Sequence, residues 1–171
     1  MDFGRLAALG NKGVLALMSD STNAERKGYT MSESTVGDIL DKLFVNCTKR
    51  IVVATFSSNV HRVQQIVNSA VKYKRKVAVC GRSMCNMIET ARKFGYIKVP
   101  DNVFIDIDSI KSYPDDSLVI ITTGSQGEPM SALTRMASGE HRKVQITPND
   151  LIIISANPIP GNEKYISKVI D

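Results

Sequence analysis

The sequence predicts an α/β domain with a mostly parallel sheet flanked by helices on both faces, a three-layer arrangement of the Rossmann type. Two observations indicate this class. Short aliphatic runs rich in β-branched residues recur without alternating polar positions, as in strands buried on both faces. Amphipathic segments of helical period separate these runs, so strand and helix alternate along the chain.

Five aliphatic runs predict the buried strands of this sheet. They are residues 14–18, 51–55, 76–80, 118–122 and 151–155. Two shorter runs, at 103–106 and 143–146, predict weaker strands, and the acidic stretch 101–116 predicts a surface connection.

Six segments with apolar residues every three or four positions predict helices. They are residues 3–9, 33–46, 60–73, 84–94, 129–138 and 163–170. Gly95 is a suitable C-terminal residue for the fourth segment. Pro129 is favourable at the first position of the fifth.

Length and composition are those of one globular domain. The chain has 171 residues, of which 43% are hydrophobic and 23% charged, so a core can form without disulfides or metals. The net charge of +5 permits an anionic partner. No signal peptide or bilayer-spanning run is apparent, so we expect a soluble cytoplasmic protein with no membrane partner. One domain over residues 1–171 is expected, with residues 1–13 as a lead-in helix and turn.

Histidines and cysteines are few. The two histidines are His61 and His141, of which His141 is expected to face solvent, and the cysteines Cys47, Cys80 and Cys85 are expected to be reduced thiols. No CxxC, HxH or HExxH spacing occurs, which excludes a complete zinc site of the usual kinds. The dinucleotide and P-loop glycine patterns are also absent.

Small polar residues follow each predicted long strand. These junctions are residues 19–23, 56–62, 81–84, 124–129 and 155–163. Because the carboxyl ends of parallel strands share one edge of a sheet, we expect the junctions to form an anion-binding edge of backbone N–H groups and hydroxyls. Arg62 and Arg82 would add positive charge. The alternative is that the serines and asparagines only cap helices.

Taken together, the junction motifs resemble the bacterial ribonuclease J family. The motifs are SDSTNAE at 19–25, FSSNVHR at 56–62, GRSM at 81–84, TTGSQGEPMSAL at 122–133 and PIPGNE at 158–163. The resemblance implies a metal-dependent ribonuclease in which a β-CASP domain is inserted into a metallo-β-lactamase domain, followed by a C-terminal domain. It implies that residues 1–171 are the β-CASP part, and that the other two domains are absent from this chain.

For the site, the resemblance implies that Asp20 hydrogen-bonds a metal-ligand histidine of the metallo-β-lactamase domain. No metal ligand is expected in this chain, and two divalent ions, zinc by resemblance, are expected in the parent enzyme. The residues expected to face RNA are Ser57, Ser58, His61, Arg62, Arg82, Ser83, Gly124, Ser125, Gln126 and Glu128. Glu128 has an alternative role as the ion-pair partner of Arg82 or Arg62.

The implied activity of the parent enzyme is hydrolysis of RNA phosphodiesters, both internally and from the 5′ end, with preference for a 5′-monophosphate. The chain alone is expected to be inactive, and its own metallo-β-lactamase domain and a second copy are the expected protein partners. The alternative function is a phosphosugar-binding module of the sugar-isomerase kind, because the loop 123–128 follows a buried strand as the sugar-phosphate loops of such proteins do.

Overall fold

The computed structural model describes residues 2–21, 24–25 and 27–171. It divides into two compact units, Met1–Met31 and Ser32–Asp171. In the first unit, helix α1 (Phe3–Lys12) is capped by Asp2, whose side chain accepts a hydrogen bond from the Arg5 backbone N–H. None of the described helices is long and apolar enough to cross a membrane.

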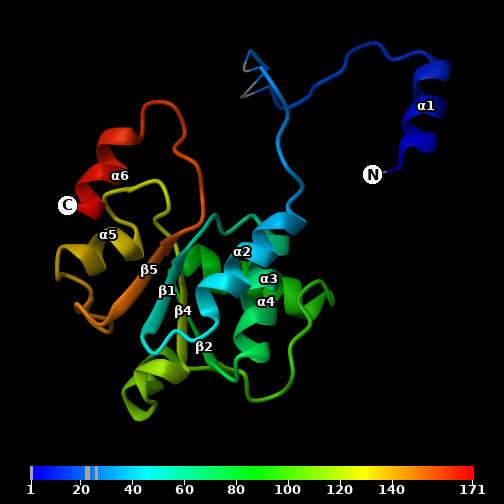
Figure 1. Cartoon of the computed structure of the whole chain (residues 1–171). Coiled ribbons are helices and arrows are strands. Elements are labelled where there is room, and N and C mark those ends of the chain that lie inside the picture. The colour runs from blue at the N-terminus through cyan, green and yellow to red at the C-terminus, as the bar shows by residue number, and fades with distance from the viewer. Residues whose placement is uncertain (1, 22–23, 26) are drawn as a thin grey trace. The chain divides into compact units, whose positions relative to one another are not determined.

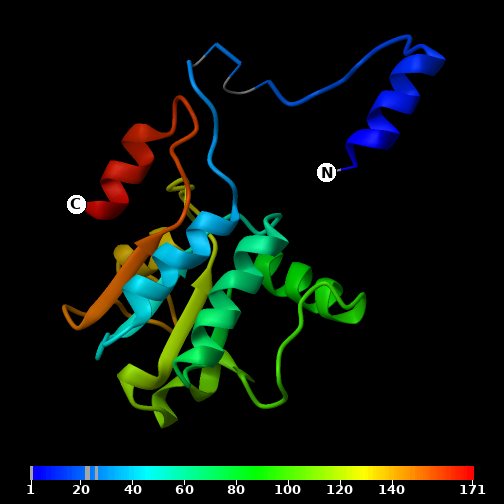
Figure 2. The ribbon, with the colours of Figure 1, turned by 45° about the vertical axis from the view of Figure 1, so that its right-hand side comes forward.

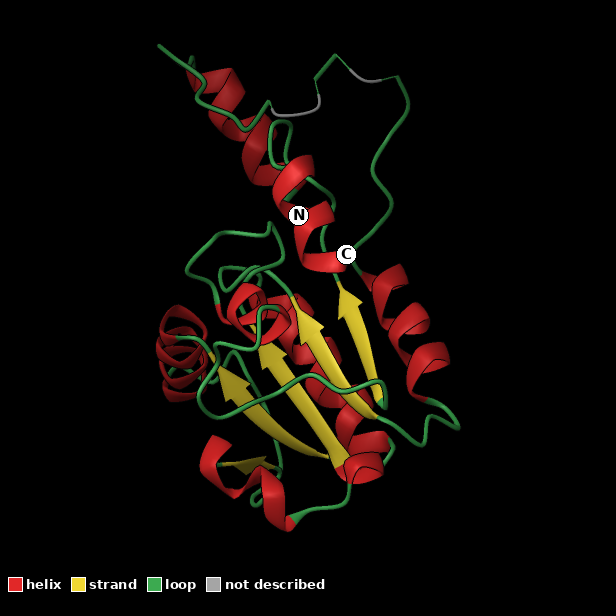
Figure 3. Cartoon of the chain, turned by 90° about the vertical axis from the view of Figure 1, so that its left-hand side faces the viewer, coloured by secondary structure: helices red, strands yellow, loops and turns green. Residues whose placement is uncertain are grey.

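The second unit is built on a five-stranded, all-parallel sheet in the order β3-β2-β4-β1-β5 (Figures 1 and 3). This confirms the predicted fold class. The strands are β1 (Arg50–Ala54), β2 (Lys76–Cys80), β3 (Phe104–Ile105), β4 (Leu118–Thr122) and β5 (Asp150–Ile154). Every residue of the central strand β4 is buried, which explains its uninterrupted aliphatic sequence.

Helices cover both faces of this sheet. Helices α2 (Ser34–Phe44), α3 (Val60–Lys72) and α4 (Arg82–Lys93) pack on one face, where they meet strand residues such as Val53 and Ile121. Helices α5 (Ala132–Ala137) and α6 (Glu163–Ile170) and the 3₁₀ turn Ile107–Ser112 lie on the other face. Figure 1 shows the two helical layers to the right and left of the strands. A second 3₁₀ turn, Asp115–Ser117, precedes β4.

Two predicted strands are wrong. Residues 14–18 form no strand, and Leu15 and Met18 are fully exposed. A strand needs a neighbouring backbone, and the described residues of the first unit contain no second strand. Residues 143–146 also lie outside the sheet. There, Val144 is buried because its side chain joins the core cluster, while its N–H donates to His141 Nδ1 over 3.0 Å.

Several helix boundaries also differ from the prediction, among them the end of α2, which lies at Phe44 rather than at residue 46. Helix α5 begins at Ala132 rather than at Pro129, because Ser131 is extended and its side chain caps the helix through the Thr134 N–H. Helix α4 begins two residues earlier than predicted, directly after Gly81, whose φ of 102° ends the strand. Helix α1 continues past residue 9 to Lys12, where Gly13 ends it.

A buried arginine closes the amino end of the sheet. Arg75, 3% exposed, precedes β2 and donates to the carbonyl oxygens of Lys49 at 2.9 Å and Leu118 at 3.2 Å, and also to that of Cys47. These carbonyls precede β1 or begin β4. One guanidinium therefore links three neighbouring strands at their starts.

Replacing Arg75 with Met keeps the aliphatic stem and leaves three carbonyls without their donor. We expect Arg75→Met to lower the free energy of unfolding by about 2–4 kcal/mol. Urea denaturation followed by circular dichroism measures this. Lys42→Met, on the exposed side of α2, is the matched control and should stay within about 0.5 kcal/mol of wild type. Equal stability of the two variants would contradict the role assigned to Arg75.

Candidate functional site

Four strands end level with one another at one edge of the sheet. The register pairs Thr122 of β4 with both Cys80 of β2 and Ala54 of β1, and Ala54 in turn with Ile154 of β5. Figure 3 shows their arrowheads pointing the same way, with loops gathered beyond them. The polar junctions predicted after β1, β2, β4 and β5 therefore share one edge, which we call the carboxyl edge.

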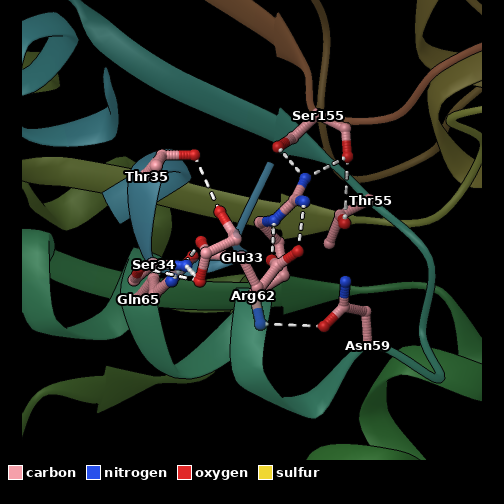
Figure 4. Close-up of polar contacts among 9 residues, drawn as sticks. Glu33, Ser34, Thr35, Thr55, Asn59, Arg62, Gln65 and Ser155 are labelled. Carbon is pink, nitrogen blue, oxygen red and sulfur yellow. Dashed lines mark hydrogen bonds and ion pairs between the residues drawn. The ribbon is translucent and has the colours of Figure 1, made fainter. Parts of the chain in front are cut away.

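Arg62, on the first turn of α3, ties three segments together at the carboxyl edge (Figure 4). Its Nε and Nη2 donate to the two carboxylate oxygens of Glu33, the latter over 2.8 Å. Its Nη1 donates to the carbonyl and the hydroxyl of Ser155, at 2.9 and 2.7 Å. The guanidinium thus joins α3 to the residue before α2 and to the loop after β5.

The bidentate contact with Arg62 holds the pKa of Glu33 below its ordinary value of 4.5. Hydrogen bonds from Arg62 are the main cause; desolvation opposes them, and the charges of Arg62 and His61 add to the lowering. Glu33 therefore carries its negative charge throughout the neutral range. The predicted alternative pairing of Arg62 with Glu128 does not occur, because the guanidinium is engaged by Glu33.

Gln126, in the loop after β4, also links separate segments of the carboxyl edge through its side chain. It is 2% exposed, and its Nε2 donates to the Asn157 carbonyl over 3.0 Å. Its Oε1 accepts from the Ile159 N–H at 2.8 Å and from Asn162 Nδ2 at 3.3 Å. Gln126 therefore fixes the loop between β5 and α6. Ser125, also 2% exposed, and Gly124 are buried beside it.

Two glycines let the loop after β4 pack this closely. Gly124 has φ of 106°, and a Cβ there would overlap the Ser131 hydroxyl. Gly127 has φ of 70°, and a Cβ there would overlap the Tyr165 carbonyl group. Any side chain at Gly127 would force α6 away from the sheet edge.

Five of the predicted RNA-facing residues have side chains without a hydrogen-bond or ion-pair partner among the described residues. They are Ser57, Ser58, His61, Arg82 and Ser83. Ser57 is half-buried and the other four are exposed. Arg82 and Ser83 are the first two residues of the twelve-residue helix α4, where backbone N–H groups also face outward. These groups are all donors suited to an anion.

Glu128 is exposed, and its carboxylate accepts the Gln126 backbone N–H over 3.3 Å. It thus supports the loop after β4. A negative charge at this position would also repel a phosphate, so a contact of Glu128 with RNA would have to be with bases or sugar hydroxyls. Whether it makes such a contact stays a prediction.

Asp20 belongs to the N-terminal unit. It is exposed, and the Ser19 hydroxyl donates to its carbonyl oxygen over 3.4 Å. Thr22 and Asn23 of the same motif lie outside the described residues. Across the described ranges 2–21, 24–25 and 27–171, no three His, Cys, Asp or Glu side chains form a group that could hold a metal ion.

The sequence prediction missed the hydrogen-bond partners of Arg62. Glu33 and Ser155 lie 29 and 93 positions from Arg62, and no local pattern indicates either pairing.

The prediction that His141 faces solvent is also wrong. His141 Nε2 lies 3.1 Å from Cys80 Sγ at the end of β2, and burial lowers the pKa of the imidazole and raises that of the thiol. Both groups are therefore neutral at pH 7.

The fold and the carboxyl edge define a parallel α/β domain with a set of unpaired donors suited to an anionic ligand. The family described as "Ribonuclease J, beta-CASP domain" matches residues 48–171. Ribonuclease J of Helicobacter pylori is 52% identical over 170 residues, that of Synechocystis 51%, and ribonuclease J2 of Bacillus subtilis 47% over 171 residues. The chain therefore belongs to the ribonuclease J family, and residues 48–171 belong to its β-CASP domain.

Each alignment includes 99% of this chain but only 25%, 27% and 31% of the respective relative. The chain thus spans about a quarter to a third of the curated relatives that it matches. The family resemblance carried by the five motifs is confirmed, while the roles of single residues within those motifs stay predictions.

The Arg62–Glu33 pair predicts a pH-dependent contribution to stability. We expect Glu33→Gln to lower the free energy of unfolding at pH 7 by about 0.5–2 kcal/mol, since the carboxylate is partly exposed. Because the folded-state pKa of Glu33 is depressed, the stabilisation is present above the unfolded pKa and is lost as pH falls through the folded one. Urea denaturation of both proteins between pH 7 and 3 should show their difference shrinking below about pH 4.5. A pH-independent difference would contradict the assignment.

The Gln126 contacts predict a local effect on the loop between β5 and α6. Gln126→Leu has similar volume but cannot bond the Ile159 N–H or the Asn157 carbonyl. Amide hydrogen exchange at Ile159 should accelerate by roughly tenfold or more, the equivalent of about 1–3 kcal/mol for unsatisfied buried groups. The matched control is Gln145→Leu, at an exposed position. Unchanged protection at Ile159 would show that Gln126 does not hold this loop.

Proposed function

We propose that this chain is the RNA-binding β-CASP part of a metal-dependent ribonuclease whose catalytic metal ions are held outside these 171 residues. The observation that carries the proposal is the group of five polar side chains on the carboxyl edge that have no partner in the part of the chain that the structure describes, in a domain belonging to the ribonuclease J family. Hydroxyls, an imidazole, a guanidinium and helix N–H groups can contact successive phosphates and sugars of a single strand.

In this proposal, the chain binds and orients RNA. Arg82 and the first N–H groups of α4 contact a phosphate, and Ser57, Ser58, His61 and Ser83 contact neighbouring phosphate or ribose oxygens. Arg62 and Gln126 act through other residues: they keep the segment before α2 and the loop after β5 in place. Gly124 and Ser125 are buried in this chain, backbone included, so no direct contact of theirs with RNA is proposed.

Two divalent ions, zinc by family resemblance, would supply an activated water to the parent enzyme. The described residues of this chain do not form a site for them, so their ligands would come from the metallo-β-lactamase part of the parent. Asp20 is proposed to hydrogen-bond a ligand histidine there and to fix its orientation. The chain alone is therefore proposed to bind RNA without hydrolysing it.

Finer properties of the parent enzyme follow only from the family. They are combined endonuclease and 5′-to-3′ exonuclease activity, preference for a 5′-monophosphate end, assembly into a homo-oligomer and a cytoplasmic location. The phosphosugar-binding alternative is disfavoured by the family match and by Ser125, which is 2% exposed. A sugar phosphate held by this loop would need that hydroxyl to be accessible.

Arg82→Gln tests the proposal directly. The 171-residue chain should bind a 5′-phosphorylated single-stranded RNA in fluorescence anisotropy, with an affinity that falls as salt rises. Removing one phosphate contact should weaken binding about threefold to tenfold and lower the slope of log K against log salt by about 0.7. Lys42→Gln, on α2, is the control for net charge.

Three outcomes would count against the proposed function. They are RNA binding that is insensitive to salt, equal effects of Arg82→Gln and Lys42→Gln, or saturable binding of hexose phosphates without binding of RNA. Hydrolysis of RNA by the purified chain, lost on chelation of metals, would contradict the placement of the metal ions outside it.

A further inference from the structure

The turn that follows α4 presents two aromatic rings to solvent. Phe94 and Tyr96 are 69% and 73% exposed, the highest values among the described aromatic residues of the unit Ser32–Asp171; the next is Tyr165 at 50%. The two stand one residue apart on the same turn. Figures 1 and 2 show it on the right-hand flank of this unit, on the side opposite α5 and α6.

This exposure is not a consequence of a loose chain end, because the turn is fixed on both sides. Gly95, with φ of 74°, donates to the Arg92 carbonyl over 3.0 Å, and the Tyr96 N–H donates to the Ala91 carbonyl over 2.8 Å. These two bonds form a Schellman motif. Ile97, the residue after Tyr96, is 4% exposed and packs in the core.

The far side of the turn is held by α3. Gln64 accepts the Lys98 N–H over 2.7 Å and donates to the Lys98 carbonyl over 2.9 Å. The backbone that carries both rings is therefore preorganised, and binding a ligand there costs little ordering of the turn.

Three cations lie within four positions of the two aromatic residues in the sequence. Arg92, Lys93 and Lys98 are all exposed, and none of them makes an ion pair with a described residue. The Arg92 guanidinium lies over the Phe104 ring, 5.2 Å from its centroid. Arg92 and Lys93 also line a hollow of about 530 Å³ with an apolar floor, to which Glu89 contributes the one acidic side chain. The local charge is positive.

We propose that this aromatic–basic turn, residues 92–98, is a second contact for single-stranded RNA, separate from the carboxyl edge. It rests on the proposed function of the chain as an RNA-binding domain. Bases stack on Phe94 and Tyr96, and Lys93 and Lys98 contact the flanking phosphates, the combination by which proteins hold single strands without reading their sequence. Phe, Tyr and Arg are also frequent in protein–protein interfaces, whereas Lys is depleted there. The two lysines, which make no ion pair with a described residue, therefore favour a polyanion such as RNA as the occupant.

The test compares variants of the 171-residue chain binding a fifteen-nucleotide, 5′-phosphorylated oligouridylate. Phe94→Ala/Tyr96→Ala should weaken binding at least tenfold, because stacking of one base is worth about a factor of 5 to 100. Phe94→Leu/Tyr96→Leu keeps apolar area but not the ring faces, and should weaken binding nearly as much. Ile39→Ala/Leu43→Ala, at two exposed apolar positions of α2, is the control and should bind within twofold of wild type.

Photocrosslinking locates the contact. With 4-thiouridine in the RNA, trypsin should release a crosslinked peptide comprising residues 94–98. If Arg82→Gln weakens binding but both Phe94/Tyr96 double variants bind like wild type, the proposed function stands and the second contact is wrong. A wild-type chain that binds no RNA overturns both. If the alanine variant binds RNA normally but changes the oligomeric state in sedimentation, the turn is a protein interface and the inference is wrong.

Discussion

The parallel register of β2, β4, β1 and β5 is the constraint on which the structure of the site depends. Thr122, Cys80, Ala54 and Ile154 end their strands at one level, so four loops with many polar groups emerge side by side above a mainly apolar core. Polar groups at such an edge must bond one another, water or a ligand, because leaving them buried and unpaired is costly. The loop sequences meet this requirement in two ways.

One set of side chains forms hydrogen bonds or ion pairs with other residues of the protein. Arg62 joins Glu33 and Ser155, and Gln126 joins Asn157 and Ile159. Both side chains act across long sequence separations, and both fix a loop that follows β5. The other set, which includes His61, Arg82 and Ser83, has no partner among the described residues. The first set holds the loops of the edge in place, and the second set is the one that we propose to contact a ligand.

The aliphatic runs at 51–55, 76–80, 118–122 and 151–155 predicted their strands to within one residue, because uninterrupted β-branched runs of this length are typical of strands buried on both faces. The run at 14–18 has the same character but forms no strand, since a strand also needs a neighbour that composition does not reveal. Pro129 was compatible with a helix start, but Ser131 provides the side-chain cap and determines the boundary.

For the site, the sequence correctly indicated that the junctions after β1, β2, β4 and β5 would meet, because parallel strands all end at the same edge of a sheet. The same prediction for the junction at 19–23 is wrong in its premise, since residues 14–18 form no strand. The sequence could not distinguish residues that face a ligand from residues whose side chains hydrogen-bond within the protein. Arg62 and Arg82 occupy similar positions at the starts of α3 and α4, yet of these two only Arg62 forms an ion pair with a described residue. That difference depends on Glu33, which the fold brings close although it lies 29 residues away in the sequence.

The central claim is that the carboxyl-edge side chains without a described partner contact RNA, while Arg62 and Gln126 hold the loops of that edge in place. The most direct measurement is a titration of the ¹⁵N-labelled chain with 5′-phosphorylated single-stranded RNA, followed by NMR. We expect large shifts for the amides of Ser57, Ser58, His61 and Ser83 and for Arg82 Nε, with Arg62 Nε and the Gln126 side-chain amide retaining their free-state signals. Shifts confined to other surfaces, or a release of Arg62 from Glu33 on binding, would contradict the claim.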